Sequence, residues 1–66
     1  MRGKIIRLID EQEFGTIAAE DGADYVFERR SLIDVTFGEL HVGAVVSFTP
    51  IIGTVPRAEA VRLVSR

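Results

Sequence analysis

Arginine is the residue of this 66-residue chain whose chemistry is best suited to binding. Lysine and arginine together number eight, and Lys4 is the single lysine. A guanidinium group is planar, pairs with a phosphate through two parallel hydrogen bonds and stacks on flat rings, whereas an ammonium group is a point charge. The arginines therefore suit a ligand that carries both phosphates and rings, and the alternative is a solvated surface of mixed charge.

Acidic residues crowd the same part of the chain and oppose a purely electrostatic binder. The net charge is −2, which disfavours non-specific binding of polyanions. Seven of the ten acids are Asp10, Glu11, Glu13, Glu20, Asp21, Asp24 and Glu28. Arg29 and Arg30 follow this acidic stretch directly. They form either an ordinary solvated pair or ion pairs with Asp21 and Asp24.

Residues for catalysis or metal binding are few. The chain has no cysteine, which excludes disulfides and thiolate sites, and one histidine, His41, which cannot build a zinc site from nitrogen ligands. Ser31 has no base near it in sequence, and Glu11 and Glu13 share a polar turn, where carboxylates are usually solvated. Neither a phosphate-cradling glycine loop nor a nucleophile elbow occurs. We expect no enzyme, no cofactor and no metal.

Short runs rich in β-branched residues, separated by turn signals, give the secondary structure. They predict five strands: Lys4–Ile9, Phe14–Ala19, Tyr25–Glu28, Ala44–Thr49 and Ala58–Val64. Asp21 and Gly22 mark a hairpin turn, and Gly15 inside the second run marks a tight bend or a close approach of backbones. Ser31 is a candidate N-cap for a helical turn over 31–34. The pattern predicts an all-β fold, a small five-stranded antiparallel barrel, which leaves no sheet edge exposed.

Length and composition predict a single domain over residues 1–66. A chain this short buries about 60% of the surface that its unfolded form exposes. The apolar fraction of 47% and the charged fraction of 27% are ordinary for a folded domain. No apolar run approaches the ~20 residues of a membrane span, and no signal-peptide core follows Met1. We expect a soluble, cytoplasmic protein that does not enter membranes.

The order of short motifs resembles the cold-shock domain, a five-stranded barrel of the OB type, over nearly the whole chain. No one block is very specific, but five occur in order at near-correct spacing. The matching blocks are residues 3–5 (Gly-Lys-Ile), 14–17 (Phe-Gly-Thr-Ile), 25–33, 37–48 and 56–61.

The resemblance implies a binder of single-stranded RNA or DNA. Bases would stack on exposed rings, each for roughly 1–3 kcal/mol, while basic groups follow the phosphates. Two of the rings are retained as Phe14 and Phe37. The tryptophan of the first strand is replaced by Arg7, or by Leu8 if the alignment slips by one residue, and a second phenylalanine is replaced by Thr16.

The third block aligns with the family in two registers. One places Phe27 among the stacking rings and turns Glu28 into the barrel, where an unpaired carboxylate costs several kcal/mol. The other turns Tyr25 and Phe27 inward and leaves Val26 and Glu28 on the outer face. We prefer the second on energy, although it needs an extra residue near Arg30. A carboxylate on the outer face would repel phosphate.

The resemblance and the substitutions together predict weak, salt-sensitive binding of single-stranded nucleic acid on the outer face of the first three strands. Arginines would supply part of the stacking that the missing rings provide elsewhere. The predicted contact residues are Arg7, Phe14, Thr16, Phe27, Arg29, Arg30, Phe37 and Arg57.

The alternative is a protein-interaction or self-associating module that has lost nucleic-acid binding. Ile6 and Val26 would make the outer face apolar. Ile51, Ile52 and Val55 lie in a loop bounded by prolines, and a small barrel can hardly bury them all. An exposed apolar patch of this kind marks a homodimer or a contact with a protein partner.

Overall fold

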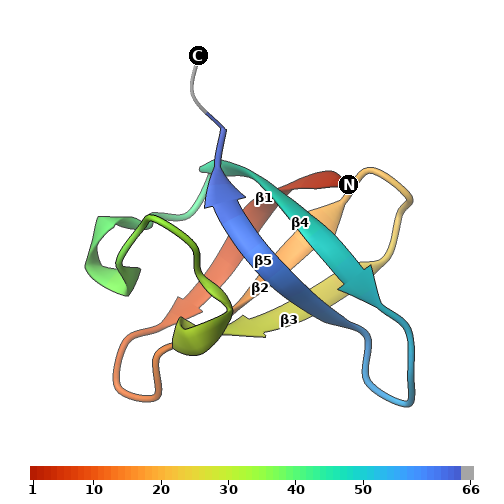
Figure 1. The fold of residues 1–66 in the computed structure, drawn as a ribbon, viewed down its shortest axis with the longest axis horizontal. Coiled ribbons are helices and arrows are strands. Elements are labelled where there is room, and N and C mark those ends of the chain that lie inside the picture. The colour runs from red at the N-terminus through yellow and green to blue at the C-terminus, as the bar shows by residue number, and fades with distance from the viewer. Residues whose placement is uncertain (65–66) are drawn as a thin grey trace.

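The computed structural model describes residues 1–64 and contains five strands and two short 3₁₀ helices (Figure 1). Each predicted strand is present, with its ends within two residues of the prediction. The elements are β1 (Arg2–Ile9), β2 (Phe14–Ala19), β3 (Asp24–Glu28), η1 (Arg29–Ser31), η2 (Phe37–Glu39), β4 (Val45–Ile51) and β5 (Arg57–Leu63).

The strands close into a barrel in the order β1-β2-β3-β5-β4, with β4 returning to β1. The predicted all-β, five-stranded barrel is confirmed and is consistent with the OB type. One pairing departs from the antiparallel prediction, because β3 and β5 run parallel. After β3 the chain crosses one end of the barrel through η1 and η2, and the β4–β5 hairpin then brings β5 beside β3 in the same direction (Figure 1).

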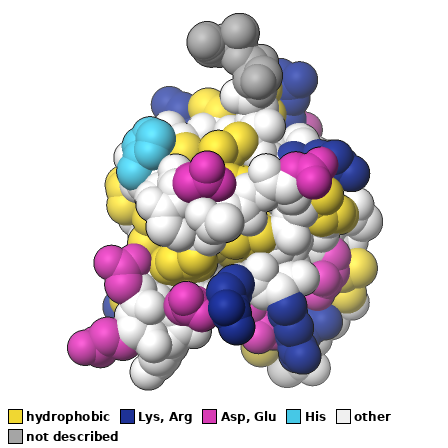
Figure 2. All heavy atoms as spheres, turned by 60° about the vertical axis from the view of Figure 1, so that its left-hand side comes forward, with side chains coloured by type: hydrophobic (Ala, Val, Ile, Leu, Met, Phe, Trp, Pro, Cys, Tyr) yellow, Lys and Arg dark blue, Asp and Glu magenta, His cyan; other side chains and the backbone are white. Residues whose placement is uncertain are grey.

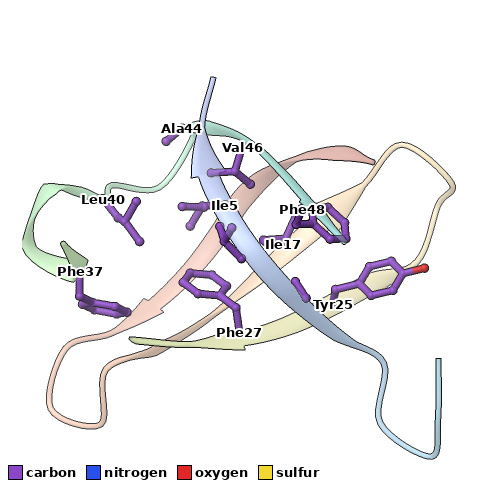
Figure 3. Close-up of a cluster of buried hydrophobic side chains, with 11 residues drawn as sticks. Ile5, Ile17, Tyr25, Phe27, Phe37, Leu40, Ala44, Val46 and Phe48 are labelled. Carbon is purple, nitrogen blue, oxygen red and sulfur yellow. The ribbon is translucent and has the colours of Figure 1, made fainter. Parts of the chain in front are cut away.

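The core lies inside the barrel and contains inward-pointing side chains from every strand (Figure 3). Phe37 and Leu40, from the connection between β3 and β4, lie at one end of this core. Tyr25 and Phe48 lie toward the other end, with ring centroids 5.2 Å apart. The fully buried large side chains are Ile5, Ile17, Tyr25, Phe27, Val46 and Val61.

Strand β3 adopts the second of the two registers. Tyr25 and Phe27 are buried, at 2% and 1% exposure, while Val26 and Glu28 are partly exposed on the outer face. The turn η1 follows at once. Gly15 lies opposite Phe27, and a Cβ atom there would lie 2.6 Å from the Arg7 carbonyl oxygen and 2.8 Å from the Phe27 ring. The predicted close approach at Gly15 is confirmed.

A bulge in β1 decides which residue takes the outer position near the end of the strand. Ile5 pairs with Ile17 and Arg7 pairs with Thr16, so Ile6 is the extra residue. A bulge of this kind reverses the side-chain alternation beyond it. Arg7 therefore lies on the outer face and Leu8 packs against the core.

A second bulge lies in β5 and explains its blurred alternation. Ser47 pairs with Arg62 and Thr49 pairs with Glu59, which leaves one extra residue on β5. Ala60 takes up this bulge in the left-handed region, with φ of 52°. Ala58 and Val61 consequently both point into the core at 0% exposure, although they are three positions apart.

The helical turn predicted over 31–34 lies two residues earlier, in η1. Ser31 ends this turn instead of capping its start, so the N-cap prediction is wrong. Its hydroxyl donates to Glu59 Oε1 at 3.2 Å, which ties the turn to β5. The later turn η2 is held by Glu39, whose carboxylate accepts the Thr36 backbone N–H at 2.8 Å.

Replacement of Ala60 by glycine should stabilise the barrel. The left-handed conformation costs an L-residue roughly 1–2 kcal/mol, more than the roughly 0.5–1 kcal/mol of chain entropy that glycine adds. We expect Ala60→Gly to raise the free energy of unfolding by up to about 1 kcal/mol in urea denaturation. Ala18→Gly, in regular strand geometry, is the matched control and should lower it. A loss of stability in Ala60→Gly would contradict the bulge.

The β2–β3 turn should make folding sensitive to acid. The Ala23 backbone N–H and the Tyr25 hydroxyl, at 2.9 and 2.7 Å, hold the pKa of Asp21 below its ordinary value of 3.8. A carboxyl with a lowered pKa stabilises the fold above its ordinary pKa, and that stabilisation is lost as the pH falls through the lowered value.

Asp21→Asn should therefore destabilise the protein at neutral pH and reduce the dependence of the urea midpoint on pH below 3.8. Asp24→Asn removes a carboxylate from the same hairpin without these two hydrogen bonds and serves as the control. Equal acid dependence in Asp21→Asn and the unmodified protein would rule out this role.

Candidate functional site

Three predicted contact residues, together with Val26, form one row across the outer face of the barrel. Arg7 on β1 pairs with Thr16 on β2, Thr16 pairs with Val26 on β3, and Val26 pairs with Arg57 on β5. Both arginines are exposed, and Thr16 and Val26 between them are partly exposed. This central row places a guanidinium group at each end of a small, uncharged surface.

A second row lies next to the central row, toward the β1–β2 turn. Ile9 pairs with Phe14, and Phe14 pairs with Glu28. Phe14 is partly exposed, so one aromatic ring of the predicted set reaches the outer face. Glu28 lies directly beside this ring on the neighbouring strand, at the position where the preferred register placed a carboxylate.

Phe27 and Phe37 belong to the core instead of the candidate surface. Their exposed fractions are 1% and 6%, and their ring centroids lie 6.4 Å apart inside the barrel (Figure 3). A buried ring presents no face to a base. This burial corrects the expectation that Phe27 and Phe37 serve as stacking rings, and its physical reason is the larger gain from burying an aromatic side chain in so small a core.

Arg29 and Arg30 form ion pairs, but with other acids than Asp21 and Asp24. Arg29 Nε lies 3.0 Å from Glu13 Oε1, and its backbone N–H donates to the Glu13 carbonyl at 3.0 Å. Arg30 lies 3.4 Å from Glu28 Oε2. Asp21 and Asp24 are out of reach because they lie at the opposite end of the β2–β3 hairpin.

The candidate surface is therefore balanced in charge. Arg57 also has an acidic partner, Glu59, at 3.3 Å, whereas Arg7 forms no ion pair with any residue in the range 1–64. Figure 2 shows basic and acidic side chains next to one another on the face in view, without a continuous basic patch. Exposed pairs of this kind contribute about 0–1 kcal/mol each, so an arginine can exchange its glutamate for another anion at little cost.

Two hollows open beside Glu28. The larger has a volume of about 340 Å³ and lies between β2, β3 and β5. The smaller, of about 320 Å³, lies between the β1–β2 turn and η1. The larger one, called here the β3–β5 hollow, is lined by Gln12, Phe14, Val26, Glu28, Ser31, Arg57, Ala58 and Glu59.

The sequence reasoning missed part of this hollow. Phe14 and Arg57 are the predicted contact residues among those that line it. The residues not predicted as contacts are Gln12, Val26, Glu28, Ser31, Ala58 and Glu59. Glu59 is brought there by the parallel pairing of β3 with β5, which no local pattern encodes. Ser31 is held there by its hydrogen bond to Glu59. Arg57 was the residue by which the sequence indicated that β5 contributes to the binding surface, because it was predicted as a contact and β5 begins at it.

A separate apolar surface lies on the outside of the barrel over β1, β2 and β4. Ile6 and Val45 are 48% and 39% exposed and border a hollow of about 390 Å³ over β1, β2 and β4. Ile52 and Val55 are also exposed, but they lie in the β4–β5 loop, at the opposite end of β4 from Val45. The expectation that the barrel leaves this loop's apolar side chains unburied is confirmed.

The described part of the chain, residues 1–64, offers neither a cluster of metal ligands nor a membrane-spanning helix. Within this range no three histidine, cysteine, aspartate or glutamate side chains gather closely enough to hold a metal ion. Nor does this part of the chain contain a helix of the length and apolar character that crossing a bilayer requires.

Two comparisons with known proteins give no match. No protein-family model fits the chain, and no curated protein resembles it significantly. The likeness to the cold-shock domain therefore rests on the order of its motifs.

Proposed function

We propose that this barrel is a cytoplasmic, non-enzymatic module that binds single-stranded RNA or DNA on its outer face, in the manner of a divergent cold-shock domain. The observation that carries this proposal is the central row together with Phe14. It aligns two guanidinium groups, an uncharged surface and one partly exposed ring across four adjacent strands. Rings and cations on one sheet face are what single-strand binders use.

Each residue has a distinct task in this proposal. Arg7 binds a phosphate, since it has no acidic partner to give up among the described residues. Phe14 stacks on a base, and Thr16 and Val26 supply van der Waals contact beside it. Arg57, Arg29 and Arg30 reach further phosphates by exchanging glutamate for the ligand, at a small cost for each exposed pair.

The same glutamates limit the affinity. Glu13, Glu28 and Glu59 each place a negative charge close to a predicted phosphate contact. With one exposed ring and a net charge of −2, binding should be weak and should disappear as salt rises. The salt dependence of log K for single strands is roughly −0.7 for each phosphate contact, so few contacts give a shallow slope.

An amide NMR titration with oligo-dT and with a mixed-sequence RNA tests the proposal. The chain has no tryptophan, so quenching of its fluorescence cannot be used. At low salt we expect shifts to concentrate at Arg7, Phe14, Thr16 and Val26, and to fade at moderate salt. Absence of shifts at millimolar ligand in low salt would sink the nucleic-acid function.

A charge variant separates local contact from overall charge. Arg7→Gln should weaken binding several-fold and reduce the salt slope by about 0.7, because one phosphate contact is lost. Arg2→Gln makes the same charge change at the far end of β1 and is the matched control. Equal weakening by both variants would show that the central row makes no specific contact.

The exposed apolar surface favours a second candidate function, self-association or contact with a protein partner. Ile6 and Val45 border the hollow over β1, β2 and β4, where the nearby lining is largely aliphatic. Sedimentation velocity at rising protein concentration should then show a dimer, and Ile6→Lys should abolish it by placing a charge in the contact. A monomer at the highest concentration would exclude self-association.

A further inference from the structure

The β3–β5 hollow has the chemistry of a pocket for one particular base. We propose that it selects guanine within a single strand, with the Glu28 carboxylate as the group that reads the base; this rests on the proposed function. The volume of about 340 Å³ is at the lower end of the range of roughly 300–1,000 Å³ for small-ligand pockets. A single flipped-out base is a ligand of suitable size.

The choice of guanine follows from the donors on its Watson–Crick edge. An ionised carboxylate accepts hydrogen bonds and donates none. Guanine presents two adjacent donors, N1–H and N2–H, that match the two oxygens of a carboxylate. Adenine and cytosine each place an acceptor nitrogen beside their amino donor, and uracil or thymine places a carbonyl oxygen on each side of its N3–H. A carboxylate therefore repels part of every other edge.

Glu28 is the carboxylate that remains able to accept these bonds. Its Oε2 pairs with Arg30 at a long 3.4 Å, and its Oε1 accepts no hydrogen bond from residues 1–64. Its side chain is 46% exposed. Glu59, the other carboxylate of the hollow, has a partner on each oxygen: Oε1 accepts from Ser31 and Oε2 pairs with Arg57. Glu28 has a partner on Oε2 alone, and this oxygen becomes available once Arg30 exchanges it for a phosphate of the strand.

The other walls of the hollow complete the match. Phe14 lies beside Glu28 through the β2–β3 pairing and offers a ring on which the base can stack. Val26 and Ala58 supply apolar contact. Arg57 lines the same hollow and is a donor, so it complements O6, the acceptor that adjoins N1–H on guanine. The hollow thus contains both a donor, Arg57, and an acceptor, Glu28, as the edge of guanine requires.

In this proposal the outward carboxylate of Glu28 contributes to recognition as well as repelling phosphate. Glu28 weakens the binding of every strand through its repulsion of phosphate, but guanine alone recovers the loss through two charge-assisted hydrogen bonds. A good bidentate contact discriminates between bases strongly, and exposure to water reduces the effect here. We expect a five- to tenfold preference.

The test uses fluorescein-labelled hexauridylate and variants in which the third uridine is replaced by guanosine, inosine, adenosine or cytidine. Affinities are measured by fluorescence anisotropy at low salt. The guanosine strand should bind five- to tenfold more tightly than the uridine, adenosine and cytidine strands. Inosine lacks the N2 amino group and should lie between, because one of the two bonds to Glu28 is lost.

Two variants locate the effect. Glu28→Gln should remove the preference for guanosine and at the same time tighten binding of hexauridylate, since a phosphate-repelling charge is gone. Glu11→Gln removes the same charge from the adjacent turn without touching the hollow, and should keep the preference. Guanosine monophosphate alone should bind at least tenfold more weakly than the guanosine strand, because it lacks the neighbouring phosphates that Arg7 would bind.

The outcomes separate this inference from the function on which it rests. Equal affinity for all five strands would overturn guanine selection and leave single-strand binding intact. A preference that survives in Glu28→Gln would also overturn it. Binding of none of the strands would overturn both proposals. Guanosine monophosphate binding as tightly as the strand would show a nucleotide pocket and would contradict recognition within a strand.

Discussion

The contact between the Phe27 ring and the backbone of Gly15 is the constraint on which the rest of this structure depends. The ring occupies the space where any other residue at position 15 would carry its Cβ atom. Once Phe27 is inside, the pleat of β3 places Tyr25 inside with it and sends Val26 and Glu28 outward. The composition of the candidate surface, with its carboxylate beside Phe14, is thus decided by one glycine and one buried ring.

Local patterns in the sequence predicted the five strands, the closed barrel and the register of β3, because each depends on alternation or on the cost of burying Glu28. They could not predict what depends on distant partners. The bulges at Ile6 and Ala60 shift the alternation without a sequence signal of their own. The parallel pairing of β5 with β3, which carries Arg57 and Glu59 to the hollow, is fixed only when the whole barrel closes. Phe37 was misplaced for a related reason: whether a ring covers the core or faces solvent depends on the path of a long connection.

The outer face combines cations and acids in nearly equal measure, and this changes what kind of recognition it can support. A face of lysines and exposed rings holds any single strand strongly. Here Arg29, Arg30 and Arg57 already have acidic partners, so a strand must compete with the protein's own carboxylates. Such competition lowers the affinity for every strand. Contacts that depend on the identity of the base then make up a larger fraction of the total binding free energy.

The seam between β3 and β5 is narrow. It contains the Val26–Arg57 pair, the hydrogen bond from Val26 N–H to the Pro56 carbonyl, and the Leu32–Val61 bridge with its bond from Ile33 N–H to Val61. These few contacts join segments about thirty residues apart, so a long loop must be closed before they can form. Amide hydrogens along the seam should accordingly exchange through local opening well below the global free energy of unfolding. The β3–β5 hollow is lined by residues of both strands, so a bound ligand would stabilise their pairing. Its binding free energy would be measurable as slower amide exchange at Val26 and Ile33.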